Sequence, residues 1–471
     1  MPFLLLLDCP ILLDVFSQKV PSMLHSYQVI PPLKLKIKKK GKLFADDILS
    51  LLLLILTFIV ILAEIFTPFL VYIIAPGFLV DDTKFNLAVE LTRITFPFLL
   101  FVSLSSFFSG ILNSNNKFAA AAAAPIFLNV VLIISILISY YQNLNIVKQL
   151  SYGVTFAGVL QLMFLIYATL EFYKPKIKFN LKISNKVKFF FRKLLPSIFS
   201  SGVNQINILV GTIIASFQTG AVSYLYYADR VYQINLAIAG IAVSAVSLPV
   251  LSKAIRFKNA TEVSIIQNKS IELSLLLSFP ASLGLIIASD EIVNGLFGYG
   301  SFSSKDIKMT SEALSFFGFG IVAFALVKIL ANFFFARDNT KTPFYISAFI
   351  VFLNVLISVS FFNQVGFVII PIATSISTWA GVFIYIYILQ KSNYLMIQKI
   401  LIRNFLKITI SAGIMALILS LSLDKFANYL EYDYNLKLIF LIIIVGFVGI
   451  VYLLSCYLLG VLKIKNYKLV R

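Results

Sequence analysis

The stretch YYADRVYQINLAIAGIAVSAVSLPVL, residues 226–251, carries two adjacent charged residues, Asp229 and Arg230, in an otherwise apolar run long enough to cross a bilayer. A hydrocarbon core is spanned by about 20 apolar residues in helical form, and a helix satisfies its own backbone hydrogen bonds in lipid. The stretch therefore predicts a transmembrane helix. Ionisable residues inside such a helix are costly, so Asp229 and Arg230 are candidates for a functional site.

Composition extends this prediction to the whole chain. Of the 471 residues, 60% are hydrophobic and 13% are charged, and the mean hydropathy is +0.95. Too few polar side chains are present to cover a water-soluble globule of this size. No polar segment is long enough to form a soluble domain. We therefore expect an all-α, polytopic membrane protein.

Catalytic and metal-binding chemistry has few residue types to draw on. His25 is the only histidine, and the two cysteines, Cys9 and Cys456, lie at opposite ends of the chain. This leaves no Ser-His-Asp arrangement within the membrane part, no HExxH helix and no paired-cysteine metal site. A GxxxxGK[ST] phosphate loop is also absent from the sequence. We expect no catalytic residues, no metal and no cofactor, and hence a protein that is not an enzyme.

Apolar runs near the bilayer-spanning length predict about twelve transmembrane helices. They cover residues 48–75, 88–112, 118–141, 151–172, 191–216, 226–252, 271–289, 312–336, 343–362, 367–390, 404–424 and 436–462.

The connecting segments differ in charge. Most of the 39 Lys and Arg residues lie in alternate connections, at 34–47, 113–117, 173–195, 253–270, 337–342, 391–407 and 463–471. By the positive-inside rule this set is cytoplasmic. The formal net charge of +19 then reflects topology and attraction to anionic membrane lipids, not nucleic-acid binding.

An internal repeat indicates two halves. GILNSNNKFAAAAAAPIFLNVVLIISIL (110–137) and FFFARDNTKTPFYISAFIVFLNVLISVSF (333–361) share a polar turn with one Lys and a later FLNV, which aligns Asn129 with Asn354. Repeats of this kind are typical of transporters. The second half has two helices upstream of its repeat that the first half lacks, so a six-plus-six plan with two C-terminal helices is short by one pair.

Four segments resemble one known family. They are LTRITFPFLLFVSLSSFFSGILNSNNKFAAAAAAPIFLN (91–129), GVNQINILVGTIIAS (202–216), AVSYLYYADRVYQINLAIAGIAVSAVSLPVLS (221–252) and LVKILANFFFARDNTKTPFYIS (326–347). In order and spacing these segments resemble the MurJ (MviN) lipid II flippase family of the superfamily of multidrug, oligosaccharidyl-lipid and polysaccharide exporters. The likeness runs from about residue 43 to the C-terminus.

The resemblance implies a fold and a function. The family plan is fourteen helices in two pseudo-symmetric lobes around a central cavity, with a groove formed by the last two helices. The implied function is to flip an undecaprenyl-diphosphate-linked peptidoglycan precursor, lipid II, across the bacterial cytoplasmic (inner) membrane by alternating access. The implied partners are this lipid-linked precursor, membrane lipids and the cell-wall synthesis machinery.

On this plan we expect an incomplete N-lobe at 43–175, a cytoplasmic inter-lobe loop at 176–193, a C-lobe at 194–398 and two additional helices at 399–471. Residues 1–42 form an atypical N-terminal segment, because their apolar runs are broken by Asp8, Pro10 and Asp14. We hypothesise that residues 1–33 are not a native transmembrane pair but the product of a truncated or altered reading frame.

Transfer of a diphosphate through hydrocarbon requires fixed cations in a wet cavity, because a bare anion there is heavily penalised. Arginine suits this role, since its planar fork holds two phosphate oxygens and stays protonated. We expect Arg230 to face the cavity, with Asp229 offsetting its charge or serving another helix. The alternative is that Arg230 snorkels to the aromatic belt of neighbouring tyrosines.

Further cavity candidates are Asn204, Gln205, Arg93 and Lys328; interhelical hydrogen bonding is the alternative for the first two and snorkelling for the last two. Glu64, near mid-span, is expected to pair with Arg93 or to titrate. In the turn ARDNTKTP (336–343), Arg337, Asp338 and Lys341 are expected to form an intracellular gate between lobes. The alternative is that this turn only caps the next helix.

Two other functions are compatible with the sequence. One is an exporter of drugs or polysaccharide carriers from the same superfamily, which would use buried carboxylates for cation coupling. The other is a non-transporting remnant, because the family's first two helices carry cavity arginines that have no counterpart in residues 1–42.

Overall fold

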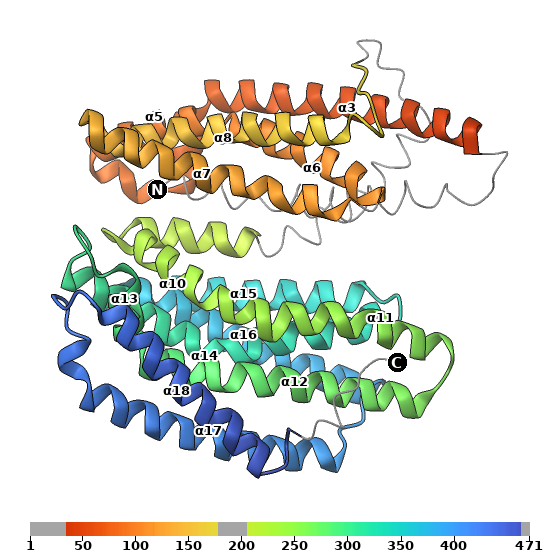
Figure 1. The fold of residues 1–471 in the computed structure, drawn as a ribbon, viewed down its shortest axis with the longest axis vertical. Coiled ribbons are helices and arrows are strands. Elements are labelled where there is room, and N and C mark those ends of the chain that lie inside the picture. The colour runs from red at the N-terminus through yellow and green to blue at the C-terminus, as the bar shows by residue number, and fades with distance from the viewer. Residues whose placement is uncertain (1–33, 116, 178–204, 463–471) are drawn as a thin grey trace. The chain divides into compact units, whose positions relative to one another are not determined.

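The computed structural model describes residues 34–115, 117–177 and 205–462, with side chains described from Lys42 onward. Every regular element in these ranges is helical, which confirms the all-α prediction (Figure 1). Backbone contacts divide the chain into two compact units, Met1–Leu209 and Val210–Arg471. Residues 1–33 and nearly all of the expected inter-lobe loop lie outside the described ranges.

The labelled helices of the first unit are α3 (Lys34–Ile65), α4 (Thr67–Ile74), η1 (Pro76–Val80), α5 (Asp82–Thr95), α6 (Phe98–Ser114), α7 (Phe118–Gln142) and α8 (Ile146–Thr169). The second unit contains α10 (Ala221–Leu236), η2 (Ala237–Ala242), α11 (Val243–Arg256), α12 (Ala260–Ile287), α13 (Ser289–Phe297), α14 (Ser304–Phe335), α15 (Lys341–Val365), η3 (Gly366–Val368), α16 (Ile369–Lys391), α17 (Lys399–Lys425), η4 (Ala427–Tyr429) and α18 (Lys437–Leu458).

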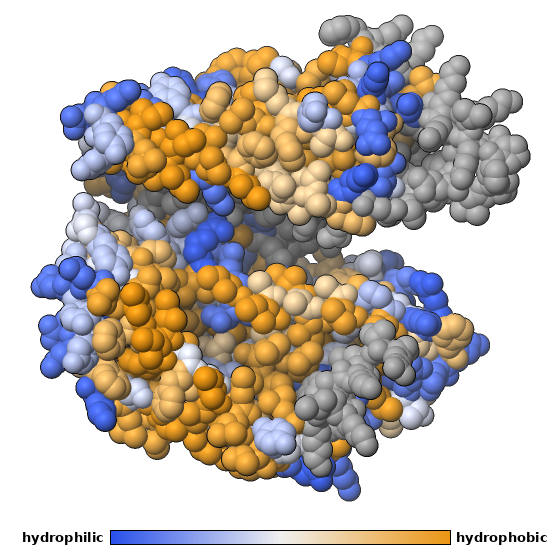
Figure 2. All heavy atoms as spheres, in the orientation of Figure 1, coloured by the Kyte–Doolittle hydropathy of each residue, from blue (hydrophilic) through white to orange (hydrophobic). Residues whose placement is uncertain are grey.

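Ten helical stretches of the described residues are long and apolar enough to cross a membrane. One of them, Lys341–Lys391, contains α15 and α16, which the sequence predicts as two spans and which Gly366 separates with a φ of 76°. The predicted span 191–216 is described only from Gln205, as the short helix Gln205–Ser216. Apolar residues cover the visible sides of the helices within each unit, and polar residues gather at helix ends (Figure 2).

Helix starts follow from local hydrogen bonding. Asp81 precedes α5 and accepts bonds from the hydroxyl of Thr83 at 2.6 Å and from the backbone N–H of Lys84 at 3.1 Å, which together hold the pKa of Asp81 below its usual value. Ser303 opens α14 in a capping box with Asp306. Such caps satisfy N–H groups that have no partner within the helix.

Both repeat segments found in the sequence form a helix, a short turn and a second helix. The first is α6–α7, with its turn around Lys117, and the second is α14–α15, with its turn at 336–340. Asn354 on α15 donates to the Thr374 hydroxyl of α16 at 2.8 Å. The repeat therefore corresponds to a repeated structural motif.

In the first unit, α3 packs on α6 around Leu56, Phe107 and Leu112. Asp46 on α3 is only 5% exposed and accepts hydrogen bonds from the Tyr173 hydroxyl at 2.7 Å and the Lys176 backbone at 3.2 Å. Burial, reinforced by the Asp46 carboxylate, raises the pKa of the Tyr173 hydroxyl. The segment that enters the expected inter-lobe loop is thus fixed to α3.

Helix α14 is the centre of the second unit, since 72% of its most apolar window is buried, more than in any of the other nine stretches. It contacts α10, α12, α13 and α16. Fully buried residues, among them Ile321, Ala325 and Phe333, occur on all sides of it. A helix that is apolar around its circumference belongs in a core.

The C-terminal pair α17–α18 is joined to the rest of the second unit by a buried lysine. Lys437, only 1% exposed, donates from Nζ to the side-chain oxygen of Asn294 at 3.0 Å and to the carbonyls of Gly298 and Tyr432, both at 2.6 Å. The rings of Tyr299 and Tyr432 lie 4.3 and 4.7 Å from the same ammonium. Three oxygens and two aromatic faces replace the water that the charge would otherwise need.

We predict that Lys437→Met lowers the melting temperature of the detergent-purified protein by several degrees. The thioether leaves three buried oxygens without their donor, a loss of about 3 kcal/mol for bonds to a charged group. Lys425→Met, at an exposed position on the same helical pair, serves as the control and should melt like the parent. Equal melting of the two variants would contradict the structural role of Lys437.

Candidate functional site

Arg230 lies on α10, nine residues after its first residue, or about 14 Å along the helix. Its guanidinium carbon is 4.6 Å from the centre of the Tyr226 ring, one helical turn earlier. Residues four apart face each other on a helix, and a guanidinium over an aromatic face is held by cation–π attraction. The tyrosine therefore fixes the direction of the Arg230 side chain.

Asp229 lies on the neighbouring face of α10. Its carboxylate accepts a hydrogen bond from the Gln233 side chain, again one turn away. Adjacent residues on an α-helix point about 100° apart, so the pairs Tyr226–Arg230 and Asp229–Gln233 occupy two faces side by side. Mutual charge offset between Asp229 and Arg230 stays a prediction, and Gln233 is a partner that the sequence analysis did not consider.

The helix that carries these residues is attached to α14. The Tyr224 hydroxyl donates to the Asp306 carboxylate at 2.9 Å, and the Tyr232 ring packs on Phe317 and Phe324 with centroid distances of 4.6 and 5.5 Å. Lys328 lies further along α14 and is exposed. The structure thus places Arg230, Asp229 and Lys328 on two helices in contact.

In the first unit, Glu64 and Arg93 each lie four residues before a proline. Pro68 and Pro97 have no backbone N–H, so the carbonyls of Glu64 and Arg93 lose their usual helical partners. The predicted spans 48–75 and 88–112 are broken at these positions, into α3 and α4 and into α5 and α6. The Thr67 hydroxyl donates to the Glu64 carbonyl at 3.1 Å and compensates one loss.

The side chains at the two breaks act on each other. Arg93 on α5 is near enough for its positive charge to favour the ionised form of the Glu64 carboxylate on α3. One carboxylate oxygen of Glu64 is buried without a hydrogen-bond partner among the described residues, whereas Arg93 is exposed. Arg93 is the twelfth residue of the Asp82–Ser114 stretch, about 17 Å from its start.

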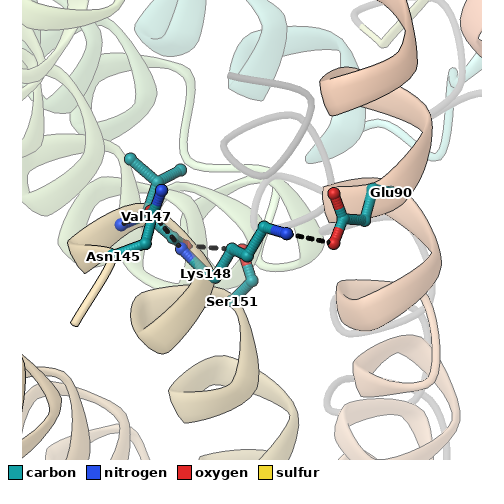
Figure 3. Close-up of polar contacts among 5 residues, drawn as sticks. All are labelled: Glu90, Asn145, Val147, Lys148 and Ser151. Atoms are coloured by element: carbon teal, nitrogen blue, oxygen red, sulfur yellow. Dashed lines mark hydrogen bonds and ion pairs between the residues drawn. The ribbon is translucent and has the colours of Figure 1, made fainter.

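A direct ion pair between Glu90 and Lys148 joins α5 to the first turn of α8 (Figure 3). Lys148 Nζ lies 2.6 Å from Glu90 Oε1, and the two side chains are 42% and 47% exposed. Asn145 caps α8 by accepting from the backbone of Val147 at 3.0 Å and of Lys148 at 3.2 Å. At this exposure the pair contributes roughly 0.2–1 kcal/mol, so it helps to align the helices and does not anchor the unit.

The other polar candidates are only partly described. Asn204 lies outside the described residues, and Gln205 is half-buried at the start of its helix. Asn207, two residues later, has a buried side-chain oxygen without a hydrogen-bond partner in the described part of the chain. The neighbouring amides Asn204 and Gln205 in an apolar segment were the sequence signal, and their cavity role stays a prediction.

Arg337 is half-buried at the turn between α14 and α15. Its guanidinium donates to the carbonyls of Phe333 at 2.6 Å and Tyr394 at 3.2 Å and lies 4.4 Å from the Tyr394 ring. Burial lowers the pKa of Arg337 below its usual value. These contacts hold the connection that leads from α16 into α17, a role that the sequence did not indicate.

The rest of the turn is exposed at Asp338 and Lys341, and Asp338 has a φ of 58°. Asn339 accepts from the Thr342 backbone N–H at 3.1 Å and so caps α15, as the capping alternative predicts. Capping by Asn339 does not exclude contacts of Asp338 and Lys341 with the other unit. The gate stays a prediction.

Within the described ranges, no three His, Cys, Asp or Glu side chains are grouped closely enough to hold a metal ion. Two of the candidate cations have local partners, Arg230 in Tyr226 and Arg337 in the Phe333 and Tyr394 carbonyls. Tyr226 was expected only as one of the neighbouring tyrosines of an aromatic belt, and Gln233 was not expected, although the spacing of four residues from Asp229 was a usable signal.

Comparisons with known proteins agree with one another. A family model described as lipid II flippase MurJ matches residues 26–441. A probable lipid II flippase MurJ of Rickettsia prowazekii is 36% identical over 427 residues, covering 89% of this chain and 83% of the relative. That of Rhizobium tropici is 35% identical over 380 residues, covering 80% and 71%.

Solved structures add the fold. A lipid II flippase MurJ in an inward closed conformation matches with a TM-score of 0.78 at 25% identity, covering 97% of this chain and 91% of that one. An inward-facing MATE transporter of the MOP superfamily matches with a TM-score of 0.69 at 15% identity, covering 83% and 90%. At 15% identity the second likeness concerns the fold alone.

We predict that Arg337→Met increases backbone hydrogen exchange in residues 392–398 severalfold, because the bond to the Tyr394 carbonyl and the ring contact are both lost. Hydrogen exchange with mass spectrometry on the purified protein measures this locally. Lys341→Met, at an exposed position of the same turn, is the control and should leave exchange in 392–398 unchanged. Unchanged exchange in the Arg337 variant would show that this connection is held by other contacts.

Proposed function

The chain belongs to the MurJ family of lipid II flippases, and we propose that it moves lipid II across the bacterial cytoplasmic membrane by alternating access. The family model covers most of the chain, and curated relatives at 35–36% identity carry the same name. The substrate of this proposal is an undecaprenyl diphosphate that bears a sugar-peptide head group. Its diphosphate is the part that hydrocarbon excludes most strongly.

The observation that carries the proposal is the way Arg230 is held. An aromatic ring contacts the face of a guanidinium, whereas phosphate oxygens bind its edge, so the Tyr226 contact and diphosphate binding are compatible. The ring also limits the rotamers of a long side chain, which reduces the entropy lost when substrate binds. Arg230 is therefore proposed as the diphosphate ligand of the second unit, with Asp229 beside it.

Arg93 is proposed as the cation of the first unit. Pro97 leaves the backbone carbonyl of Arg93 itself without its usual helical donor. Broken helices at mid-membrane are common in transporter binding sites. Glu64 then supplies a nearby negative charge that makes the guanidinium less costly in the absence of substrate. Lys328, Asn204 and Gln205 complete the proposed polar lining.

Alternating access requires two bodies that move as units. The two compact units, divided between Leu209 and Val210, are proposed as these bodies. Asp338 and Lys341 are exposed at the turn between α14 and α15, and with Arg337 they are proposed as gate residues that contact the other unit in one state of the cycle. The expected location is the bacterial inner membrane, with the wall synthesis machinery as consumer of the product.

We predict that the chain restores growth to a bacterial strain depleted of its own lipid II flippase, and that Arg230→Ala abolishes this rescue. Arg230→Lys should rescue poorly, because an ammonium keeps the charge but loses two-point binding of phosphate. Arg256→Ala, at an exposed position near the end of α11, is the matched control and should rescue like the parent.

Membrane levels of each variant are to be compared by immunoblot, so that loss of protein is separated from loss of function. Failure of the unaltered chain at normal membrane levels would argue for a non-transporting protein or an exporter of another substrate. Full rescue by Arg230→Ala would remove Arg230 from the proposed site.

A further inference from the structure

The span that carries Arg230 is not a uniform α-helix. Between α10 and α11 the segment Ala237–Ala242 is π-helical. In a π-helix each N–H bonds to the carbonyl five residues back instead of four, so one π-helical turn accommodates one more residue than an α-helical turn. This segment begins two turns beyond Arg230.

The spacing of buried residues before and after the segment is a second indication that the segment contains one extra residue. In α10 they are Ala221, Tyr224, Ala228 and Val231, which follow the α-helical repeat. In α11 they are Val243, Ser247, Leu251 and Ala254. Continued at 3.6 residues per turn, the first series would reach positions about one residue earlier than the second, a difference of roughly 100° in direction. The extra residue of the π-helical turn removes this difference.

Both α10 and α11 are bonded to α14, so the orientation of each about its own axis can be compared against the same helix. At one end the Tyr224 hydroxyl bonds Asp306 at 2.9 Å. At the other the Asn332 amide donates to the carbonyl of Ser244 at 2.8 Å and to its hydroxyl at 2.7 Å. Neither half is therefore able to turn about its axis without breaking polar bonds.

Gly240 allows close packing in the middle. A Cβ on Gly240 would lie 3.1 Å from the Ala325 Cα on α14, a contact with backbone that has little room to relax. The wider π-helical turn thus packs directly on the buried centre of α14. Ala239 is buried beside Gly240, whereas Ala237, Ile238, Ile241 and Ala242 are exposed.

We propose that the π-helical segment Ala237–Ala242 is the positioning element of Arg230. Its surplus residue keeps the Arg230 face about 100° from the direction that an uninterrupted α-helix of the same sequence would give it relative to α11. Without it Val231 would take the place of Arg230, and the guanidinium would turn about 100° into the place of Asp229. The importance of this segment for transport rests on the proposed role of Arg230 as a diphosphate ligand. Its effect on the orientation of Arg230 does not depend on that role.

The test uses one-residue changes within the segment. Deletion of Ala242 should convert the segment to α-helix and leave Arg230 where it is, whereas insertion of one Ala after Ala242 should move Val231 into the place of Arg230. In a regular helix, deletion and insertion each turn α10 by the same angle in opposite senses. An asymmetry between them is therefore specific to a surplus residue.

Orientation is read by thiol labelling in the full chain with Cys9→Ser and Cys456→Ala. Arg230→Cys and Val231→Cys are introduced separately and treated with a membrane-impermeant maleimide. We expect labelling at 230 and protection at 231 in the parent and in the Ala242 deletion, and labelling at 231 in the insertion. Protection of 230 in the deletion variant would overturn the proposal.

A second deletion guards against a local folding defect. Removal of Ile238, also exposed, should give the same labelling pattern and the same membrane level as the parent. Failure of both deletions to accumulate, while the insertion accumulates, would equally overturn the proposal, because a surplus residue is dispensable for packing.

Binding of undecaprenyl diphosphate to the purified variants separates this inference from the proposed function. The deletion should bind within about twofold of the parent, and the insertion should bind as weakly as Arg230→Ala. If the labelling is as expected but the parent binds no diphosphate, the ligand role of Arg230 fails and the positioning by the π-helical segment stands.

Discussion

Hydrocarbon offers neither hydrogen bonds nor counter-charges, and this constraint governs every ionisable side chain that the protein places within its helical spans. The solutions differ with the task. Lys437 is enclosed by three oxygens and two rings, so these groups take the place of water around its ammonium. Arg230 is held on one face by a ring, which directs the guanidinium without neutralising it. The first arrangement suits a structural anchor, and the second suits a group that must meet an anion.

Departures from regular α-helix occur close to the charges of the proposed site. Pro68 and Pro97 follow Glu64 and Arg93 by four residues, and the π-helical turn follows Arg230 within the same span. A broken or widened turn leaves backbone groups without their usual partners and changes the direction of the side chains before it. Such turns are costly in lipid unless neighbouring groups compensate, as the Thr67 hydroxyl does. Their association with ionisable residues in both units is consistent with a polar transport path.

The same constraint explains why one fold serves different substrates. The likeness to a MATE transporter extends over most of the chain at 15% identity, so helix packing is compatible with very different side chains. The charged candidates for the cavity in this chain are three cations, Arg93, Lys328 and Arg230, and one carboxylate, Asp229, and their net positive charge suits the proposed diphosphate substrate.

The sequence by itself determined the all-helical class, the approximate spans, the repeat and the family, because each depends on hydropathy and motifs carried by neighbouring residues. It also singled out Arg230, since a charge in an apolar run is visible without any structure. It did not reveal the enclosure of Lys437, to which Asn294, Gly298 and Tyr299 contribute from more than a hundred positions away. Nor did it reveal the bond between Arg337 and the Tyr394 carbonyl. It also gave no sign of the π-helical turn, whose extra residue becomes evident only when buried positions on both sides are compared against α14. These features depend on contacts between helices that are distant in the sequence. The residues on either side of each position do not determine those contacts.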